Sequence, residues 1–515
     1  MNIRGSPVAA LTQRVSKKSC LTRSATKERK LFEQALQHNA NWAIDDGETI
    51  LCDWYSDDDT ANPQNWSTFT KAYVLVTISI YACTIYMAAS LFTPDSEAFD
   101  EEFGTGHAYT SLGIGTYVLG YGCGPLLFGP LSEISAVGRN WPYLVSYVLF
   151  ILVSIPTALV QNESAFMFLR FLQGFCGSPA LTTGGASLAD VYDQVHLPYA
   201  MTVWVVGTFC APAIGPIISG FALPVLGWRF TMWEVLLSSV PTFVMLLFLP
   251  ETSGPCILYR RTAQLRCITG NSNIKTKQDA SQPHLSPKQL IFHSFGIPLK
   301  ITIMDPAMLF TNLYMALVYS IFYSFFECFP LTYQGIYHFN LGEMGCTFLS
   351  WAIGSVIAFV TYNIYLYTSW VPTVKRNNDL GKQEDHLKPA LLGSLLPPIG
   401  LLVFGWTARP DIHWIISQIG VVIYPAGIFV LLQTLFLYIS VSYPQYSASL
   451  LGLSEFTRGI LACVAVVIAR PLFLNLGLGP ACSLLAGLTS ICVGGIFFLY
   501  HYGEALRKRS RFIEA

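Results

Sequence analysis

The chain has 515 residues, of which 52% are hydrophobic and only 12% are charged, and its formal net charge is −1. Soluble globular proteins carry about 25% charged residues, so this composition excludes an ordinary soluble domain. Apolar runs long enough to cross a bilayer as helices, about 18 residues or more, recur along the chain. They are too long and too uniformly apolar for the strands of a membrane barrel. The sequence therefore predicts an all-α membrane protein.

Residues 1–69 are polar and of mixed charge, and no apolar core follows the early basic residues. We expect them to form a largely disordered cytosolic tail without a cleavable signal peptide. Six spans are predicted within residues 70–250 and six within residues 304–503, around a polar central loop of residues 251–303, with a cytosolic tail at 504–515. The expected spans are 70–92, 108–129, 142–160, 165–189, 198–222, 230–250, 304–329, 344–367, 389–407, 412–440, 447–471 and 479–503. Two six-helix halves joined by a long loop are typical of carriers built from repeats.

Orientation follows from the loops, because loops rich in lysine and arginine stay in the cytosol. Basic residues gather in the central loop, after the eighth span and at the C-terminus, whereas residues 93–107 are acidic. The basic residues are Arg260, Arg261, Arg266, Lys275, Lys277, Lys288, Lys375, Arg376, Lys382, Lys388, Arg507, Lys508, Arg509 and Arg511. Both termini are therefore expected in the cytosol, and the acidic loop with Asp95, Glu97, Asp100, Glu101 and Glu102 is expected outside.

Polar residues mark the turn between the second and third spans, Gly129 to Asn140, where Glu133 and Arg139 sit at the membrane edge. Residues this costly at a bilayer edge usually have a role. They either fix two helices together or stabilise one conformation of a protein that changes its conformation. Asp190 and Asp193, at the end of the fourth span, are candidates to join them.

The fourth span carries Arg170, Gln173, Gly174 and Gly177 on one helix face, at i, i+3, i+4 and i+7. A buried arginine in a span must face protein or water rather than lipid. It either pairs helices structurally or acts as a proton-linked cation lining a central cavity, and the sequence leaves both interpretations open. The two glycines would let a neighbouring helix approach closely.

The fifth span contains two interleaved rows of small or helix-bending residues. One row is Gly207, Ala211, Gly215 and Ser219, and the adjacent row is Pro212, Pro216 and Gly220. Small residues in a row allow two backbones to pack closely, and the prolines remove backbone donors and bend the helix. We therefore expect close helix packing along both rows.

Span seven presents Tyr319, Tyr323 and Glu327 at i, i+4 and i+8. An isolated carboxylate in a span is a candidate for exchanging a proton with the substrate or the coupling pathway; the alternative is a hydrogen bond to a neighbouring helix. Glu455 and Arg458 are expected to pair near the cytosolic end of span eleven. Glu234 is expected to pair with Arg229 or to cap its helix.

Central polar and aromatic side chains are the candidate lining of an apolar substrate cavity. Such a lining takes flat hydrophobic compounds and, by cation–π contact, some cations. The candidates are Tyr81, Gln173, Trp204, Tyr319, Tyr323, Trp351 and Tyr424.

From Asp53 to Tyr502 the chain resembles the major facilitator superfamily, specifically the fungal twelve-span drug:proton antiporters. The matching segments are Gly129 to Glu133 with Gly138-Arg139, Leu169-Arg170 with Gln173-Gly174, Gly207 to Gly220, Pro250-Glu-Thr252, and Phe325 to Pro330. The long spacer before Gly138 is similar to that of the fluconazole/benomyl-resistance branch. Asn140, Ala211, Ser219 and Glu384-Asp-His-Leu387 depart from the family pattern.

This resemblance implies a major facilitator fold of two six-helix bundles and the residue roles of that family. Arg170 would serve proton coupling together with Glu327, the acidic residue already singled out. Glu133, Gly138 and Arg139 would form a cytosolic latch, which is a set of contacts that stabilises one closed conformation. This latch would be weaker than in many relatives, because Asn140 stands in place of a second basic residue. The two rows of the fifth span would be the antiporter motif and favour export.

The expected function is proton-coupled export of small, mostly hydrophobic organic compounds by alternating access. A narrow polyamine or single-metabolite carrier and a transporter-like sensor stay open as alternatives. No enzyme is expected, because no nucleophile motif or phosphate-binding glycine loop is present. We expect no cofactor and no metal, since the proton gradient drives the cycle. The expected partners are a small-molecule substrate, protons and the lipid bilayer, without nucleic acid. We expect a monomer in the plasma membrane, with the vacuolar membrane as the alternative.

Overall fold

The computed structural model describes residues 49–276, 296–377, 383–443 and 446–507, together with residues 28, 30–32, 34, 44 and 45. Among these residues, eleven helices are long and apolar enough to cross a membrane. The expected fourth span forms two shorter pieces, α9 (Glu163–Gly177) and α10 (Pro179–Val191). Proline removes a helix hydrogen bond and crowds the preceding turn, which explains the interruption at Ser178. With this broken rod, the described chain contains twelve long rods.

The first bundle is built from residues 68–247. Its rods are α3 (Thr68–Ser90), α6 (Leu112–Cys123) with α7 (Pro125–Glu133), α8 (Asn140–Leu159), α9 with α10, α11 (Leu197–Leu226) and α12 (Trp228–Leu247). Two short helices, α4 (Ser96–Phe103) and α5 (His107–Thr110), join α3 to α6.

The second bundle is built from residues 306–507. Its rods are α17 (Pro306–Phe329), α18 (Leu341–Thr347) with α19 (Leu349–Tyr365), α21 (Lys388–Gly393) with α22 (Leu396–Thr407), α23 (Trp414–Ser442), α24 (Ser447–Leu476) and α25 (Leu478–Arg507). A π-helical turn, Pro330–Gln334, extends α17, and another, Leu366–Trp370, joins α19 to α20 (Val371–Asn377). A 3₁₀ turn, Gln383–Leu387, precedes α21, and α16 (Ile297–Met304) precedes α17.

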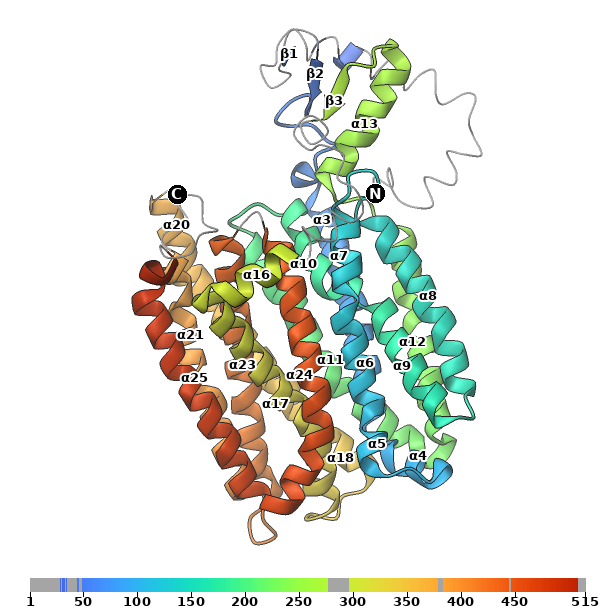
Figure 1. Cartoon of the computed structure of the whole chain (residues 1–515), viewed down its shortest axis with the longest axis vertical. Coiled ribbons are helices and arrows are strands. Elements are labelled where there is room, and N and C mark those ends of the chain that lie inside the picture. The colour runs from blue at the N-terminus through green and yellow to red at the C-terminus, as the bar shows by residue number, and fades with distance from the viewer. Residues whose placement is uncertain are drawn as a thin grey trace.

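Successive rods run in opposite directions, so their connections fall alternately at two ends of the molecule (Figure 1). One end carries α13 (Gly254–Thr269) and the strands, and we name it the terminal face. The other end carries α4, α5 and α18, and we name it the opposite face. A residue's depth in the bundle therefore follows from its place along its rod.

Backbone approaches that only glycine permits hold the first bundle together. A Cβ on Gly174 of α9 would lie 2.1 Å from the Tyr117 carbonyl oxygen, and one on Gly120 of α6 would lie 2.1 Å from the Phe171 carbonyl oxygen. These glycines let α6 and α9 touch along their backbones. Gly177 instead faces α3, where a Cβ would lie 2.7 Å from the Ile85 side chain.

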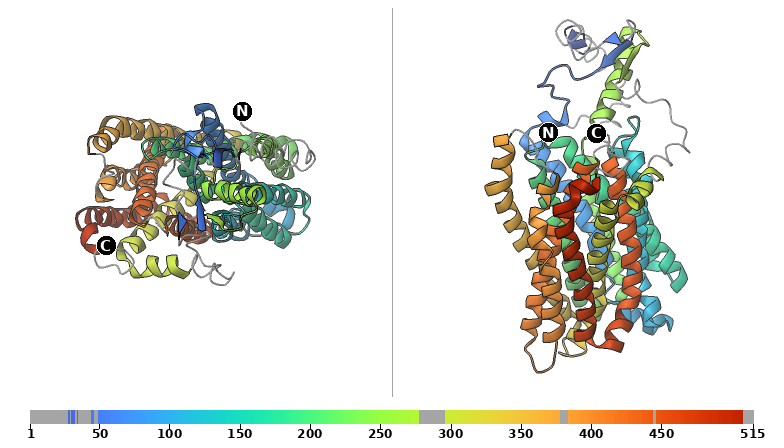
Figure 2. Two further views of the ribbon diagram at one scale, coloured as in Figure 1. Left: turned by 90° about the horizontal axis from the view of Figure 1, so that it is seen from above. Right: turned by 60° about the vertical axis from the view of Figure 1, so that its left-hand side comes forward.

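A small folded unit stands on the terminal face, and it includes part of the expected N-terminal tail and part of the central loop (Figure 2). The strands are β1 (Ile44–Asp45), β2 (Thr49–Cys52) and β3 (Ile274–Thr276); β2 pairs antiparallel with β1 and parallel with β3. The tail expected to be largely disordered is thus ordered from residue 49, and the central loop contains α13. We name β1, β2, β3 and α13 the cap.

A buried ion pair and a short apolar core explain why the cap folds. Arg261 of α13 donates to the Asp59 carboxylate at 2.7 Å, and both side chains are 8% exposed. The Arg261 guanidinium also lies 4.2 Å from the centre of the Tyr55 ring. Ser253 caps the start of α13, and Gly270, in the left-handed region, ends it. Residues 1–27, 277–295 and 508–515, including Lys277, Lys288 and Lys508, lie outside the described residues, as does Lys382.

Candidate substrate and proton pathway

A cavity of about 290 Å³ lies between the two bundles in the half of the molecule nearer the terminal face. Its walls come from the ends of rods that meet at that face, including Leu197 of α11, Trp370 and His386. Two wall residues, Ala189 and Gln194, are exposed, so the cavity communicates with the terminal face. This volume is near the lower end of small-molecule pockets, which span about 300–1,000 Å³.

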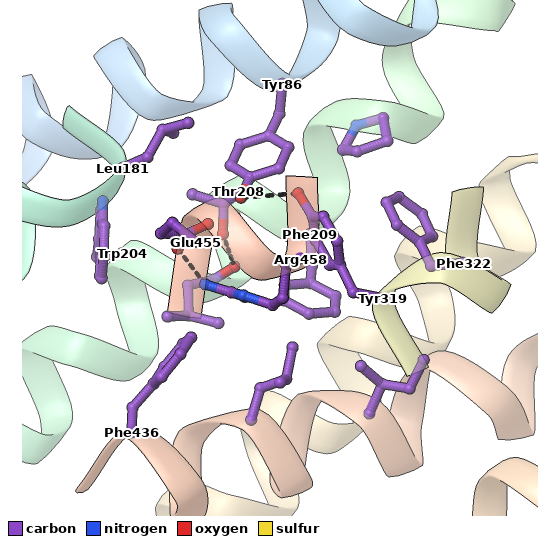
Figure 3. A pocket seen from close by; sticks show the side chains of 14 residues that line it. Tyr86, Leu181, Trp204, Thr208, Phe209, Tyr319, Phe322, Phe436, Glu455 and Arg458 are labelled. Carbon is purple, nitrogen blue, oxygen red and sulfur yellow. Dashed lines mark hydrogen bonds and ion pairs between the residues drawn. The ribbon is translucent and has the colours of Figure 1, made fainter. Parts of the chain in front are cut away.

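A second, much smaller cavity of about 30 Å³ lies deeper, where both bundles contribute side chains. This space is far too small for an organic substrate, since small-molecule pockets span about 300–1,000 Å³. Tyr86, Trp204 and Phe209 line it from the first bundle, and Tyr319 and Phe436 line it from the second (Figure 3). Trp204 and Leu181 belong to the walls of both cavities, which makes the two spaces neighbours.

The charged residues of this region are Glu455 and Arg458, one turn apart on α24. Arg458 donates to Glu455 Oε1, and Glu455 lines both cavities (Figure 3). The other carboxylate oxygen, Oε2, is buried and has no hydrogen-bond partner among the described residues. The pairing expected from the sequence is confirmed, and it lies between the two bundles in the half of α24 nearer the terminal face. An unpaired buried carboxylate oxygen is costly, so this atom is a candidate for binding a proton or a substrate donor.

Four tyrosines tie the bundles together beside this pair. Tyr121 of α6 contacts the Tyr319 hydroxyl and donates to the Tyr323 hydroxyl at 2.8 Å, both on α17. Tyr319 in turn donates to the Tyr86 hydroxyl of α3 at 3.2 Å. The Arg458 guanidinium lies 5.1 Å from the centre of the Tyr319 ring. The hydrogen bonds therefore connect the two bundles directly beside the ion pair.

On the opposite face, the bundles close against each other. A Cβ on Gly220 of α11 would lie 2.5 Å from the Leu341 carbonyl oxygen, and one on Gly345 of α18 would lie 2.3 Å from the Pro216 carbonyl oxygen. Such distances leave no room for side chains between the two backbones. The cavities are thus open toward the terminal face and sealed toward the opposite face.

Trp204 and Tyr319 lie in cavity walls, but the other expected lining residues line neither of these two cavities. Tyr81 is enclosed in the first bundle, with its ring 4.7 Å from that of Tyr147. Tyr323 is buried in the tyrosine cluster. The expectation of cavity lining is corrected for these residues, because their spans are buried on several faces and packing takes most of their aromatic side chains.

The same correction applies to Trp351, Tyr424 and Gln173. Trp351 and Tyr424 pack together inside the second bundle at 5.7 Å between ring centres, and Tyr424 donates to the Val318 carbonyl oxygen. Gln173 accepts from Arg170 and donates to Ser154 Oγ at 2.7 Å. The contacts of Tyr424 and Gln173 occupy the polar atoms that a substrate would otherwise use.

Arg170 is fully buried in the first bundle and lines neither of the two cavities. Its guanidinium donates to the backbone oxygens of Gly113, Ala88 and Ala89, at 3.1, 3.1 and 3.4 Å. It also lies 4.5 Å from the centre of the Tyr117 ring. Of the two interpretations that the sequence leaves open for Arg170, the structural one matches these contacts: the guanidinium joins the ends of α3 and α6 near the opposite face.

Glu327 is 8% exposed and lies near the end of α17 at the opposite face. Its electrostatic partners are Ser111, Arg470 and Asp100. This position is distant along α17 from Tyr319, which lines the small cavity. Glu327 is therefore placed at the sealed end rather than at the cavity.

The turn between α7 and α8 is anchored by residues that its own motif does not include. Arg139 Nε lies 3.1 Å from Asp190 Oδ2 of α10, which confirms that Asp190 joins this cluster. Glu251, which follows α12 and is 2% exposed, accepts the Arg139 backbone N–H at 2.9 Å. Glu133 is exposed, and Asp193 pairs with His196 instead. Asp190 is thus the carboxylate within ion-pair distance of Arg139, and Glu133 adds an electrostatic attraction without such a contact.

The two rows of the fifth span face different neighbours. A Cβ on Gly215 would lie 2.2 Å from Ser90 Oγ of α3, whereas Gly220 meets α18 of the other bundle. Ala211 and Ser219 are fully buried beside Gly215, and Pro212 lines the small cavity. At Gly207 the nearest atom to a Cβ would be 3.8 Å away, so this position is not tightly packed.

Sequence reasoning misses two acidic residues that the structure makes prominent. It identifies Glu251 only as part of a family motif, although an isolated carboxylate just after a span is itself a signal. It groups Asp95 with the acidic loop, yet Asp95 is fully buried and Thr231 donates to it. No group of three His, Cys, Asp or Glu side chains among the described residues is arranged to hold a metal ion.

The chain matches the Major Facilitator Superfamily over residues 78–466. An MFS-type transporter, pyvG, from Aspergillus violaceofuscus is 46% identical over 464 residues, covering 90% of this chain and 85% of the relative. Fluconazole resistance protein 1 of Saccharomyces cerevisiae is 35% identical over 477 residues, covering 92% and 86%. The proton:xylose symporter XylE superposes with a TM-score of 0.60 at 12% identity, covering 85% of this chain and 96% of that one. With twelve rods in two bundles and a cavity between them, the chain belongs to the Major Facilitator Superfamily.

Proposed function

We propose that this protein is a proton-coupled secondary exporter of small, mostly hydrophobic organic compounds, working by alternating access. The name of one relative, Fluconazole resistance protein 1, supports a role in removing such compounds. The cavity supports it too, because its walls combine aromatic and aliphatic side chains with few charges. We further propose that the protein acts as a monomer in the plasma membrane, without a cofactor.

In this proposal the terminal face lies in the cytosol. The described basic residues at this face include Arg260, Arg266, Lys375 and Lys388, and cytosolic loops are the ones that carry such residues. The opposite face instead carries the acidic helix α4. The cavity is then open to the cytosol, which is the side from which an exporter loads its substrate.

The proposal rests mainly on the contacts of the Glu455 carboxylate. Its Oε1 is held by Arg458, whereas its Oε2 is buried beside both cavities without a partner among the described residues. A proton on Oε2 and a substrate that donates a hydrogen bond to Oε2 cannot occupy the atom together. Competition at a single atom is what antiport requires: the substrate binds when Glu455 is ionised and is displaced when a proton arrives.

The net charge of the Glu455–Arg458 pair determines which conformation each protonation state favours. Glu455 and Arg458 together are neutral, so the intact pair tolerates a neutral apolar substrate in a low-dielectric cavity. Protonation of Glu455 leaves Arg458 as an uncompensated cation, which favours the conformation that gives this charge other partners. Glu327, at the opposite face, is a candidate for passing the proton inward from outside.

The test uses fluconazole as the probe in proteoliposomes that hold the purified protein. E455Q should abolish proton-driven accumulation, whereas exchange of labelled for unlabelled fluconazole should persist, because exchange needs no net proton movement. Asp411→Asn, at an exposed acidic residue of the same bundle, is the matched control and should behave as wild type. Accumulation by E455Q that a protonophore still collapses would refute the role of Glu455.

A carrier for one compound is the second candidate function. The cavity volume of about 290 Å³ favours it, because this volume lies at the small end of ligand pockets, which span about 300–1,000 Å³. A panel of hydrophobic growth inhibitors in a yeast strain without its own pumps distinguishes the two. Resistance to many unrelated compounds supports the broad exporter, and resistance to none or one supports the narrow carrier.

A further inference from the structure

Four residues in the wall of the larger cavity have polar side-chain atoms without a hydrogen-bond partner among the described residues. Each of the four is more than nine-tenths buried, with exposed fractions of 4% to 8%. The atoms are Trp204 Nε1, Gln433 Nε2, Glu455 Oε2 and both ring nitrogens of His386. We name these four residues the polar set. The cavity wall thus contains hydrogen-bonding groups that the fold itself does not use.

Such groups are costly unless something pairs with them. A buried donor or acceptor without a partner has lost its hydrogen bonds to water and gained none in return. Most buried polar side-chain atoms in folded proteins are therefore paired, and an unpaired one needs an explanation. A binding site explains them, because a ligand with matching polar atoms pairs with the groups and an analogue without those atoms leaves them unpaired.

The kinds of polar atom in the set predict the kinds of group on the ligand. The N–H groups of Trp204 and Gln433 only donate, so they require acceptor atoms on the ligand. The Oε2 atom of ionised Glu455 only accepts, so it requires a hydroxyl or N–H group. The neutral imidazole of His386 offers one donor and one acceptor. A ligand that satisfies the polar set therefore has both acceptors and a donor.

The polar set spans both bundles. Trp204 lies on α11 of the first bundle, whereas Gln433 of α23 and Glu455 of α24 belong to the second. His386 lies in the 3₁₀ turn before α21, within a segment that departs from the family pattern. Its ring centre is 6.4 Å from that of Trp370, another wall residue. One compound in this cavity can therefore meet polar groups of both bundles beside aromatic surfaces.

The charges around the cavity restrict the ligand further. Glu455 is the only acidic residue among the described wall residues, and its partner Arg458 neutralises it. No lysine or arginine belongs to the described wall, which is mostly apolar and includes Leu181, Leu437 and Leu451. A charged compound would lose its hydration there without gaining an ion-pair partner. The wall therefore favours an uncharged ligand.

We propose that the larger cavity selects an uncharged, largely apolar compound that has a hydroxyl group and at least one carbonyl or ether oxygen. The hydroxyl donates to Glu455, and the other oxygens accept from Gln433 and Trp204, while His386 serves either kind of group. Neighbouring side chains cover these atoms, so the side chains of Gln433 and Glu455 rotate onto the ligand as it enters. The transport of such a compound rests on the proposed function, but its binding does not.

Three compounds of matched shape test this class by equilibrium binding to the purified protein in lipid nanodiscs, without a proton gradient. The probe 6-hydroxyflavone has the hydroxyl and the acceptor oxygens, flavone lacks only the hydroxyl, and 2-phenylnaphthalene lacks every oxygen. After correction for partitioning into empty nanodiscs, the dissociation constant should rise about tenfold from the first to the second and severalfold more to the third. Equal constants would mean that water serves the polar set, and they would overturn the proposal, as would no binding of 6-hydroxyflavone.

Wall variants test which groups recognise the oxygens. Gln433→Leu and His386→Leu should each weaken the binding of both flavones severalfold and leave that of 2-phenylnaphthalene unchanged, whereas a merely structural role would weaken all three alike. Trp204→Phe keeps an aromatic ring, removes the N–H and should act in the same way. Ser440→Ala is the matched control in the same wall. Its hydroxyl already donates to the Phe436 carbonyl oxygen at 2.9 Å, so the ratios between the three compounds should be those of the wild type.

Transport separates this inference from the proposed function. The same three compounds are offered to proteoliposomes that contain the protein and maintain a proton gradient. Equal accumulation of all three would support the exporter and overturn the substrate class. Graded binding in nanodiscs without any proton-driven accumulation would support the substrate class and refute the proposed export.

Discussion

Gly138, in the turn between α7 and α8, provides the most direct test of how that turn is held. Its backbone has φ of +76°, in the left-handed region. A Cβ there would lie 2.5 Å from Glu251 Oε2 and 2.6 Å from Cys256 Sγ. Gly138→Ala therefore strains the backbone and pushes on the carboxylate that anchors the turn.

The magnitude follows from two contributions. A non-glycine residue in the left-handed region costs about 1–2 kcal/mol. Glu251 accepts the backbone N–H groups of Arg139 and Ser253 at 2.9 and 3.1 Å, and losing one charged hydrogen bond costs about 1.5–3 kcal/mol. Gly138→Ala should thus destabilise the first bundle by about 2.5–5 kcal/mol.

The assay is the thermal midpoint of the detergent-solubilised protein, which should fall by roughly 10 °C for a bundle of this size. Gly129→Ala is the matched control: it lies in α7 with no atom within 4 Å of a Cβ, so it should be neutral or gain about 0.5–1 kcal/mol. In an E251A background the clash with the carboxylate disappears, and Gly138→Ala should cost less than in the wild-type background, because only the backbone strain and the close contact with Cys256 Sγ remain. Equal midpoints for Gly138→Ala and Gly129→Ala in the wild-type background would refute the anchoring by Glu251.

Two further changes test the contacts between bundles and within the cap. Gly220→Val should abolish export without preventing membrane insertion, because a Cβ would lie 2.5 Å from the Leu341 carbonyl oxygen; Gly207→Val on the same helix should export normally, and equal loss in both would contradict the close contact. Burial raises the pKa of Asp59, but the Arg261 hydrogen bond and backbone donors outweigh it, so its pKa is lowered. This pair therefore stabilises the cap above the ordinary carboxyl pKa of about 3.9, and the stabilisation is lost as the pH falls through the lowered value. D59N should cost about 3 kcal/mol at neutral pH, seen as roughly hundredfold faster amide exchange in β2, and unchanged exchange would show that the pair contributes nothing.

Hydropathy predicts the twelve rods because each must present about 20 apolar residues to lipid. It does not predict the break at Ser178, since a single proline within a span bends, interrupts or leaves a helix depending on its neighbours. The cap has no comparable signal. Its strands β2 and β3 are four and three residues long and lie far apart in the chain, and only their pairing makes them strands.

Periodicity locates the polar residues but not the direction they face. On α17, Tyr319 lines a cavity while Tyr323, one turn later, is enclosed by tyrosines and phenylalanines. Residues 318–329 of α17 are all buried, so their sequence shows no polar face from which the direction of a side chain could be inferred. Spacing identifies Glu455 as a partner of Arg458. The position of Glu455 between the two bundles, however, depends on how the bundles pack together, and the sequence of a single span does not encode that packing.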